Sequence, residues 1–238
     1  MDFSSLGAHD RVAWPAIECF GALKAAAEET ERIRLASLVL IAPLRATADI
    51  AEAAVAVGPR LTLGVGIGPR EDDYTASAAD FHTRGRRLEE QLRELPQHWQ
   101  GPILVGGGGD AALDRMARLA AGYVHGGGPA RAFKSAADRA LAAWYDHDHR
   151  DPPRLVGTGY FALGGDAAEG RDFLRSYYRF VGPFAERIAD GVLSSRGEVE
   201  ELAGGYAEAG CDELVLFPTV PRLEQLELLA GAVSGIQV

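Results

Sequence analysis

The sequence predicts an α/β protein, and within that class a TIM-type (β/α) barrel. Seven short apolar segments are each followed by a segment with helical periodicity, and this alternation implies crossover connections and a parallel sheet. The chain has 238 residues, close to the roughly 250 of such a barrel. No linker or low-complexity tract divides it, so we expect one domain over residues 1–238. A doubly wound open sheet is the alternative, because a barrel has eight strands and we count seven.

The predicted strands are short runs with continuous apolar content. IRLASLVLI is such a run, and RLTLGVGI is another that ends in glycines. The seven predicted strands cover residues 2–9, 33–41, 60–67, 102–105, 123–125, 155–163 and 213–217.

The predicted helices carry apolar residues on one face. Leu88, Leu92 and Leu95 recur at i, i+4 and i+7, which is one face of a helix. Gly182 and Pro183 interrupt the longest helical segment. Four predicted helices cover about residues 15–31, 47–57, 81–95 and 166–195. Apolar faces within residues 113–120, 133–144, 202–209 and 223–230 mark four further helices.

Composition excludes several classes of protein. The chain has 24 basic and 34 acidic residues, a net charge of −10, whereas nucleic-acid and anionic-membrane surfaces need clustered Lys and Arg. No apolar run is long enough to span a bilayer, and the first residues lack the basic and apolar regions of a signal peptide. Cys19 and Cys211 are the only cysteines, too few for a disulfide framework. We therefore expect a cytoplasmic protein.

A glycine-rich turn follows the fourth predicted strand. The segment ILVGGGGDAALDR, residues 103–115, reads as strand, turn and helix. The N-terminus of a helix has unpaired N–H groups and the positive end of the helix dipole, which together bind phosphate. A tight turn with Asp110 as the helix N-cap is the alternative. The sequence leaves both interpretations open.

Polar and glycine residues also follow the first and third strands. Asp10 and Arg11 come directly after the first strand, where they would contact a polar ligand or form a local ion pair. Gly66 and Gly68 lie in GVGIG, but the following PREDDY does not begin an apolar-faced helix, which excludes a dinucleotide-binding fingerprint. These glycines favour close backbone approach to a flat ligand, or simply mark a glycine-rich strand end.

No side chain indicates covalent or metal catalysis. His147 and His149 lie at a polar helix end without a nearby cysteine, so we predict no metal site. No nucleophile elbow or Walker loop is present. This pattern is typical of a protein whose cofactor carries the chemistry.

Five segments, in order along the chain, resemble the bacterial luciferase-like family of FMN-dependent monooxygenases and deazaflavin (F420) dependent oxidoreductases. They are TERIRLASLVLIAPLR, LGVGIGPREDD, FHTRGRRLEE, PILVGGGGDAA and DELVLFPT, at residues 30–45, 63–73, 81–90, 102–112 and 212–219. The resemblance implies a barrel, usually dimeric, that binds its flavin at the carboxyl ends of the strands and acts on a small organic substrate. The style of the third and fourth segments favours the deazaflavin branch over FMN.

The resemblance also implies roles for individual residues. Asp10 matches an acidic residue near the flavin ring, and Arg11 stands where many deazaflavin members have a histidine, so we expect these two in catalysis. The bond between Leu38 and Val39 matches a non-prolyl cis peptide behind the ring. The remaining implied cofactor-binding residues lie beside the ring or hold the phosphate: Gly66, Gly68, Gly106, Gly107, Gly108 and Gly109.

The chain departs from the family pattern in three places, and one of them is the connection from Leu95 to Pro102, which is shorter than the usual family segment. The chain also lacks the strand and helix with which the family begins, so we expect a barrel without its first strand–helix unit. Pro69 stands where some deazaflavin dehydrogenases have a glutamate acid. These departures favour a second hypothesis, a non-catalytic flavin-binding protein or subunit. A third is an unrelated barrel enzyme that binds a sugar phosphate at residues 106–109.

Overall fold

The computed structural model describes residues 3–234. Within them the chain forms two compact units. The N-terminal unit contains Ser4–Val124 and Arg139–Arg154. The C-terminal unit contains His125–Asp138 and most of the chain after residue 154. Each unit is described by itself.

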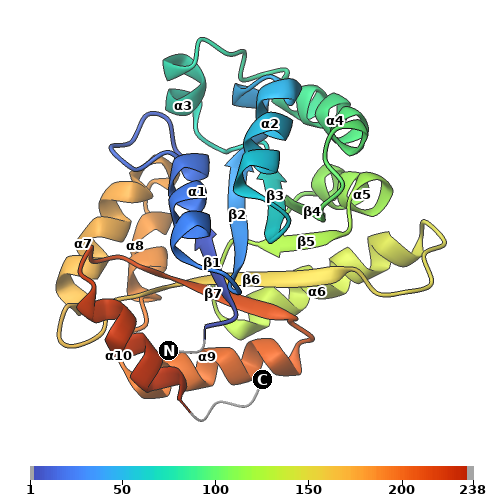
Figure 1. Cartoon of the computed structure of the whole chain (residues 1–238). Helices are drawn as coiled ribbons and strands as arrows, with labels where there is room; N and C mark the ends of the chain where they lie inside the picture. The colour runs from blue at the N-terminus through green and yellow to red at the C-terminus, as the bar shows by residue number, and fades with distance from the viewer. Residues whose placement is uncertain (1–2, 235–238) are drawn as a thin grey trace. The chain divides into compact units, whose positions relative to one another are not determined.

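The N-terminal unit is a parallel sheet covered by helices (Figure 1). Each strand pairs in parallel with the next strand along the chain. The strands are β1 (Ser5–Ala8), β2 (Arg34–Ile41), β3 (Leu61–Gly66), β4 (Ile103–Gly106) and β5 (Gly122–His125). The helices are α1 (Cys19–Glu29), η1 (Ala42–Leu44), α2 (Thr47–Val57), α3 (Glu71–Ala76), α4 (Arg84–Glu94), η2 (Leu95–Gln97), α5 (Asp110–Leu119) and the end of α6 (Ala130–Tyr145).

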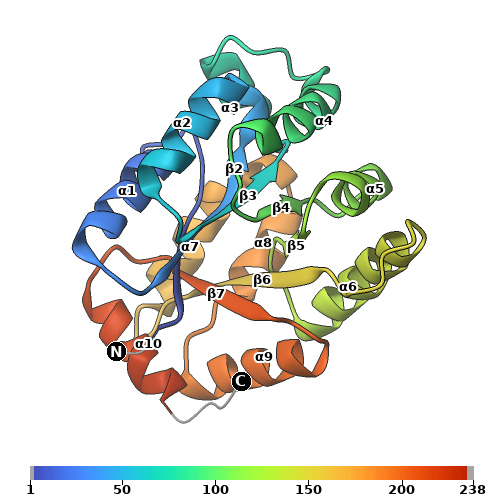
Figure 2. The same cartoon turned by 45° about the vertical axis from the view of Figure 1, so that its right-hand side comes forward.

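The strands β2 and β3 are mostly apolar and mostly buried. All six residues of β3 are buried, and Leu35 and Leu40 of β2 have no exposed surface. Helices α1 and α2 lie side by side next to these strands (Figure 2). Continuous apolar runs are typical of parallel strands covered in this way.

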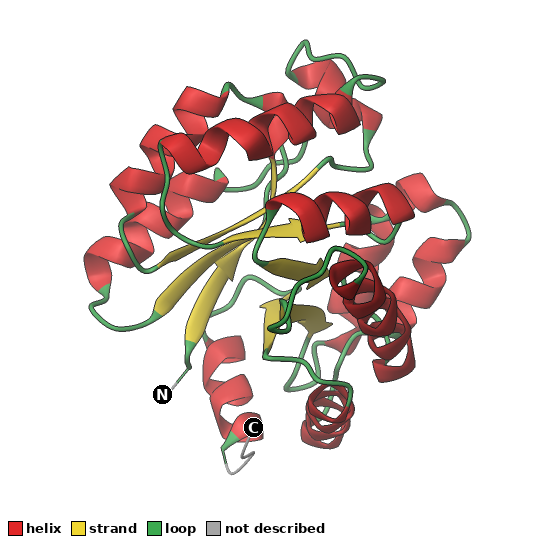
Figure 3. Cartoon of the chain, turned by 90° about the vertical axis from the view of Figure 1, so that its right-hand side faces the viewer, coloured by secondary structure: helices red, strands yellow, loops and turns green. Residues whose placement is uncertain are grey.

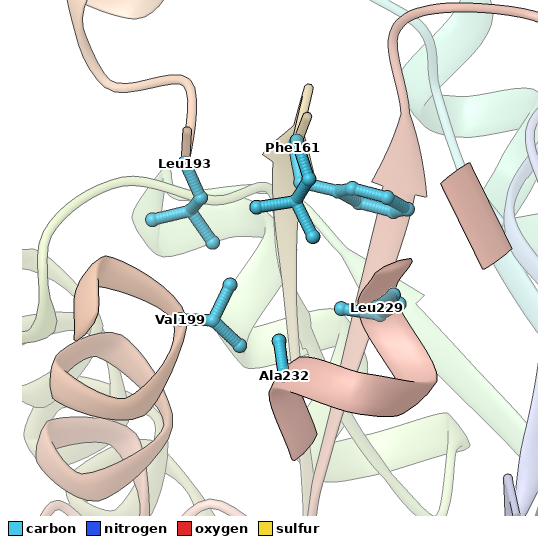
Figure 4. Close-up of a cluster of buried hydrophobic side chains, with 6 residues drawn as sticks. Phe161, Leu193, Val199, Leu229 and Ala232 are labelled. Atoms are coloured by element: carbon cyan, nitrogen blue, oxygen red, sulfur yellow. The ribbon is translucent and has the colours of Figure 1, made fainter. Parts of the chain in front are cut away.

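The C-terminal unit has two parallel strands, β6 (Arg154–Phe161) and β7 (Glu213–Pro218). Its helices are α7 (Ala167–Tyr177), η3 (Arg179–Val181), α8 (Phe184–Asp190), α9 (Arg196–Glu208) and α10 (Glu224–Val233). Part of its core is shown in Figure 4, where Phe161 of β6 packs with Val199 of α9 and Leu229 of α10. The predicted break in the long helical segment is confirmed, because Gly182 has a φ of +60° between η3 and α8.

The predicted fold class is confirmed. The strands alternate with helices, and every pairing described within a unit is parallel (Figure 3). This alternation is that of the TIM-type (β/α) fold class, and residues 3–234 contain seven strands. No helix within residues 3–234 is long and apolar enough to cross a membrane.

Two local predictions were wrong. The first helix begins at Cys19 rather than residue 15, and the Glu18 side chain accepts a hydrogen bond from the Gly21 amide at its start. PREDDY contributes to the short helix α3 (Glu71–Ala76), where no helix was expected. Three acidic residues in the first turn of α3 favour this start through the helix dipole.

Candidate functional site

The residues predicted to form the site all lie in the N-terminal unit. Asp10 and Arg11 follow β1, Leu38 and Val39 lie within β2, and the glycines lie at the ends of β3 and β4. Because these strands are parallel neighbours, their carboxyl ends meet at one edge of the sheet. This edge is the usual place for ligand binding in such folds.

Asp10 is buried and fully engaged by protein groups. Its carboxylate accepts two hydrogen bonds from the Arg45 guanidinium, at 2.7 and 2.9 Å. It also accepts one from the Ile41 amide at 2.8 Å, at the end of β2. A bidentate pair of this kind is among the stronger polar contacts in proteins. Asp10 therefore fixes the carboxyl end of β2 next to that of β1.

Arg11 is held in a second buried ion pair. Its Nε donates to Asp73 Oδ1 at 3.0 Å, and its Nη2 donates to Asp72 Oδ2 at 3.1 Å. The Asp73 carboxylate, which has no exposed surface, also accepts from the amides of Val12 and Ala13, at 2.9 and 2.8 Å. This cluster anchors the loop after β1 to α3. In this structure the side chains of Asp10 and Arg11 form local ion pairs, which is the alternative that the sequence left open. Their contact with a ligand stays a prediction.

His9 is a titratable residue that directly follows β1 in the chain. Burial and the nearby charge of Arg70 lower the pKa of His9 to about 4. The imidazole is therefore neutral at neutral pH. A neutral imidazole both donates and accepts a hydrogen bond, so His9 is a further candidate for contact with a polar ligand.

The bond between Leu38 and Val39 is cis, as the resemblance implies. The register between β2 and β3 shifts between Ser37 and Leu40, around this bond. The side chain of Val39 then lies against two of the predicted cofactor-binding glycines. A Cβ on Gly66 would come within 2.8 Å of Val39 Cγ2, and one on Gly106 within 3.0 Å of Val39 Cγ1.

These contacts give the glycines a packing role. Real Cβ atoms essentially never approach another atom within 3.0 Å, so Gly66 has no room for a side chain beside Val39. Gly68 has a φ of +66°, and its Cβ would come within 2.8 Å of Ile41 Cγ2. Both glycines are therefore required by neighbouring side chains of β2. Close approach to a flat ligand stays a prediction for them.

The turn between β4 and α5 has a different character. Gly107 has a φ of +133°, which a side chain rarely adopts, whereas a Cβ on Gly108 or Gly109 would have no atom within 4 Å. Both residues are exposed. Gly109 is the N-cap of α5, and as a glycine it has no side chain to cap the first amides of the helix. The turn is therefore an open cradle at a helix N-terminus, the arrangement that accepts a phosphate.

Arg139 of α6 contacts this turn. Its Nη1 donates to the Gly108 carbonyl at 2.9 Å, and its Nη2 donates to Asp110 Oδ1 at 2.6 Å. The Asp110 side chain is 96% exposed, and the Arg139 side chain is 48% exposed. The predicted cap by Asp110 is wrong, since the N-cap is Gly109 and Asp110 is the first residue of the helix.

The histidines at the end of α6 have protein partners. His147 Nε2 lies 3.3 Å from Asp114 Oδ1. His149 Nε2 lies 2.7 Å from the Ala117 carbonyl, and its ring stacks on Trp144. Within residues 3–234 we find no group of three or more His, Cys, Asp or Glu side chains that could hold a metal ion.

Arg45, Asp73 and Arg139 are not among the predicted site residues. Arg45 follows the second strand, and this position at the carboxyl end of a strand could have identified it as a candidate. Asp73 and Arg139 act through contacts with residues 62 and 31 positions away in the chain. No local pattern marks such contacts.

The comparison with protein families confirms the resemblance seen in the sequence. Residues 3–101 match the family model described as luciferase-like monooxygenase. The matched range contains Asp10, Arg11, the cis bond and the glycines of β3. It ends before the turn at residues 106–109.

Three curated relatives match part of the chain. They are uncharacterized proteins of Mycobacterium bovis and of two strains of Mycobacterium tuberculosis, each 34% identical over 143 residues. The match covers 48% of this chain and 49% of each relative. The chain therefore spans about half the length of the curated relatives it matches.

Solved structures show the same fold. An F420-dependent secondary alcohol dehydrogenase, in complex with an F420-acetone adduct, superposes with a TM-score of 0.84 at 10% identity, over 99% of this chain and 91% of that chain. Riboflavin lyase, with modified FMN and riboflavin, gives 0.75 at 11% identity, over 97% and 80%. The coenzyme F420-dependent tetrahydromethanopterin reductase of Methanopyrus kandleri gives 0.67 at 14% identity, over 96% and 89%.

Proposed function

We propose that the chain is a flavin- or deazaflavin-dependent oxidoreductase or monooxygenase of the luciferase-like type, acting on a small organic substrate. The observation that carries the proposal is the open glycine cradle at the start of α5, in a fold shared with F420- and FMN-binding proteins. FMN or F420, when bound, would supply the hydride or oxygen chemistry.

The residues of this chain would bind and position that group. The cradle at Gly108 and Gly109 would take its phosphate, because the amides of a helix N-terminus favour an anion there. The end of β2, fixed by Asp10, would border the ring, and neutral His9 would offer a hydrogen bond. The titration below distinguishes FMN from F420. The segments at residues 81–90 and 102–112 favour F420.

Titration of the purified protein with FMN and with F420, followed by fluorescence, tests the proposal. We expect one of them to bind with a Kd well below about 1 mM, which corresponds to about −4 kcal/mol. If neither binds below that concentration, the proposed function is wrong.

A matched pair of variants at one position of the turn locates the binding. Gly108 does not have a positive φ, so Gly108→Ala should be tolerated and should change the Kd by less than threefold or so, since Ala adds one methyl group. Gly108→Asp adds a carboxylate where the phosphate would lie. We expect it to weaken binding by roughly tenfold or more, as like charges repel at close range. Equal affinities of the two variants would contradict the assignment of the phosphate to this turn.

A second candidate function is that of a non-catalytic flavin-binding protein or subunit. It is favoured by the buried ion pairs of Asp10 and Arg11, which engage the two side chains predicted to act in catalysis. Flavin binding without oxidase, reductase or monooxygenase turnover on a panel of small substrates would support this candidate. Robust turnover would exclude it.

We also propose that the chain forms a homodimer, which is the usual state implied by the resemblance. Sedimentation equilibrium is expected to give twice the chain mass of 25.3 kDa. A single species at the chain mass, at concentrations well above micromolar, would contradict this.

A further inference from the structure

The strongest observation outside the predicted site residues is the placement of Arg139. This side chain comes from α6 and contacts the glycine turn at two points, the Gly108 carbonyl and the Asp110 carboxylate. An open surface depression lies beside this contact, and both Asp110 and Arg139 line it.

The Asp110 carboxylate would repel a phosphate bound at this turn, and the Arg139 guanidinium offsets that repulsion. Asp110 is the first residue of α5, and its side chain is almost fully exposed. A carboxylate at that position is attracted by the same helix dipole that would attract a phosphate, so it competes with the phosphate and repels it. The Arg139 guanidinium, at 2.6 Å from Asp110 Oδ1, neutralises that carboxylate and holds it to one side.

The second contact of Arg139 fixes the turn itself. The guanidinium donates to the Gly108 carbonyl, which directs that carbonyl toward α6. The Arg139 side chain is half exposed, so it can also offer an N–H group to a phosphate placed there.

We propose that Arg139 is a positioning residue for the phosphate of the bound flavin, acting by neutralising Asp110 at the N-terminus of α5. This inference rests on the proposed function. The inference concerns only the binding of the phosphate. It can therefore be tested separately from the binding of the flavin ring.

The experiment compares FMN with riboflavin, which lacks the phosphate, in titrations of the wild-type protein and its variants. We expect wild type to bind FMN more tightly than riboflavin. Arg139→Ala should weaken FMN by about tenfold, the effect of losing one charge-assisted contact, and leave riboflavin within about twofold. Arg139→Lys, which keeps the charge without the forked geometry, should lie between.

The double variant R139A/D110N separates electrostatics from structure. If Arg139 acts by neutralising Asp110, removal of the Asp110 charge in the R139A background should recover part of the lost FMN affinity. If Arg139 only holds the turn in place, D110N should recover nothing. Lys134→Ala is the matched control, because it removes one positive charge from the same helix at an exposed pair with Asp138, and it should leave both ligands unaffected.

Several outcomes overturn the inference. Equal loss of FMN and riboflavin affinity in R139A, an unchanged FMN affinity in R139A, or no recovery in the double variant would each do so. Tighter binding of FMN than riboflavin by wild type together with an unchanged R139A variant would refute the role of Arg139 while leaving the proposed function intact. If wild type does not bind FMN, the inference is wrong, and the proposed function is wrong only if F420 does not bind either.

Discussion

At the scale of single residues, Asp73 anchors the loop after β1. Its carboxylate, with no exposed surface, accepts from Arg11 and from the amides of Val12 and Ala13. Asp73→Asn removes the charge that balances a buried guanidinium. We expect it to lower the free energy of unfolding by about 3 kcal/mol, measured by urea denaturation.

Asp72 provides the control for this prediction. It pairs with the same arginine at 3.1 Å, but its side chain is 54% exposed. Asp72→Asn should cost less than about 1 kcal/mol, because solvent screens an exposed pair. Equal losses for Asp72→Asn and Asp73→Asn would show that burial is not what gives the Arg11 pair its strength.

The second residue-scale prediction concerns pH and His9. Burial, followed by the charge of Arg70, lowers the pKa of His9 from 6.5 to about 4. Between those values the unfolded chain binds a proton that the folded protein does not, so stability is retained above about pH 6.5 and lost as the pH falls toward 4. Over that whole interval the loss is on the order of 3 kcal/mol, of which about 2 kcal/mol falls between pH 7 and pH 5.

Urea denaturation of wild type and His9→Gln at pH 7 and at pH 5 measures this contribution. Glutamine keeps hydrogen-bonding capacity and does not titrate, so the variant should lose less stability over that interval than wild type. Identical pH dependence in the two proteins would contradict the lowered pKa. Acidic groups contribute equally to both and cancel in the difference.

At the scale of elements, β2, β3 and β4 are fitted to one another around Val39. Gly66→Ala would place a Cβ within 2.8 Å of Val39 Cγ2, and such overpacking costs about 1–3 kcal/mol. Val39→Ala removes the atom that clashes. We therefore expect the double variant G66A/V39A to be more stable than the sum of the single losses predicts, with a coupling above about 0.5 kcal/mol. Thermal or urea unfolding of the four proteins measures the coupling, and strictly additive losses would contradict the contact.

The elements also show which parts of the site the sequence could predict. Helix α2 (Thr47–Val57) has the bounds predicted for it, because its alanine-rich spacing is a local property. Helix α3 was missed because its buried Asp73 is matched by Arg11, 62 residues earlier. The glycine turn before α5 was visible as a pattern. The packing of Gly66 against Val39 could not be predicted, because the two residues lie in different strands. The sequence pattern of one strand gives no information about its contacts with the other.

At the scale of the whole molecule, the fold class was predictable for a simple reason. The patterns that predict strands and helices are local properties of the sequence. Because strands and helices alternate strictly, few sheet topologies other than a parallel sheet are compatible with the chain. The contacts within the candidate site depend on residues far apart in the sequence. The ion pairs of Asp10 and Arg11 join groups 35 and 62 positions apart in the chain. The sequence therefore predicted these two residues but not their partners.

Ligand binding should stabilise the whole molecule by mass action. A flavin that binds only the folded state adds about 2.7 kcal/mol at a concentration of 100 Kd, which for a chain of this size raises Tm by roughly 5–10 °C. We expect that rise with FMN or F420, measured by thermal unfolding, and a smaller rise with riboflavin at the same concentration, because it lacks the phosphate that the turn before α5 would hold. Inorganic phosphate alone should give little, since most of the binding energy would come from burial of the ring. An equal rise with riboflavin and FMN would place the phosphate in solvent and contradict its assignment to residues 106–109.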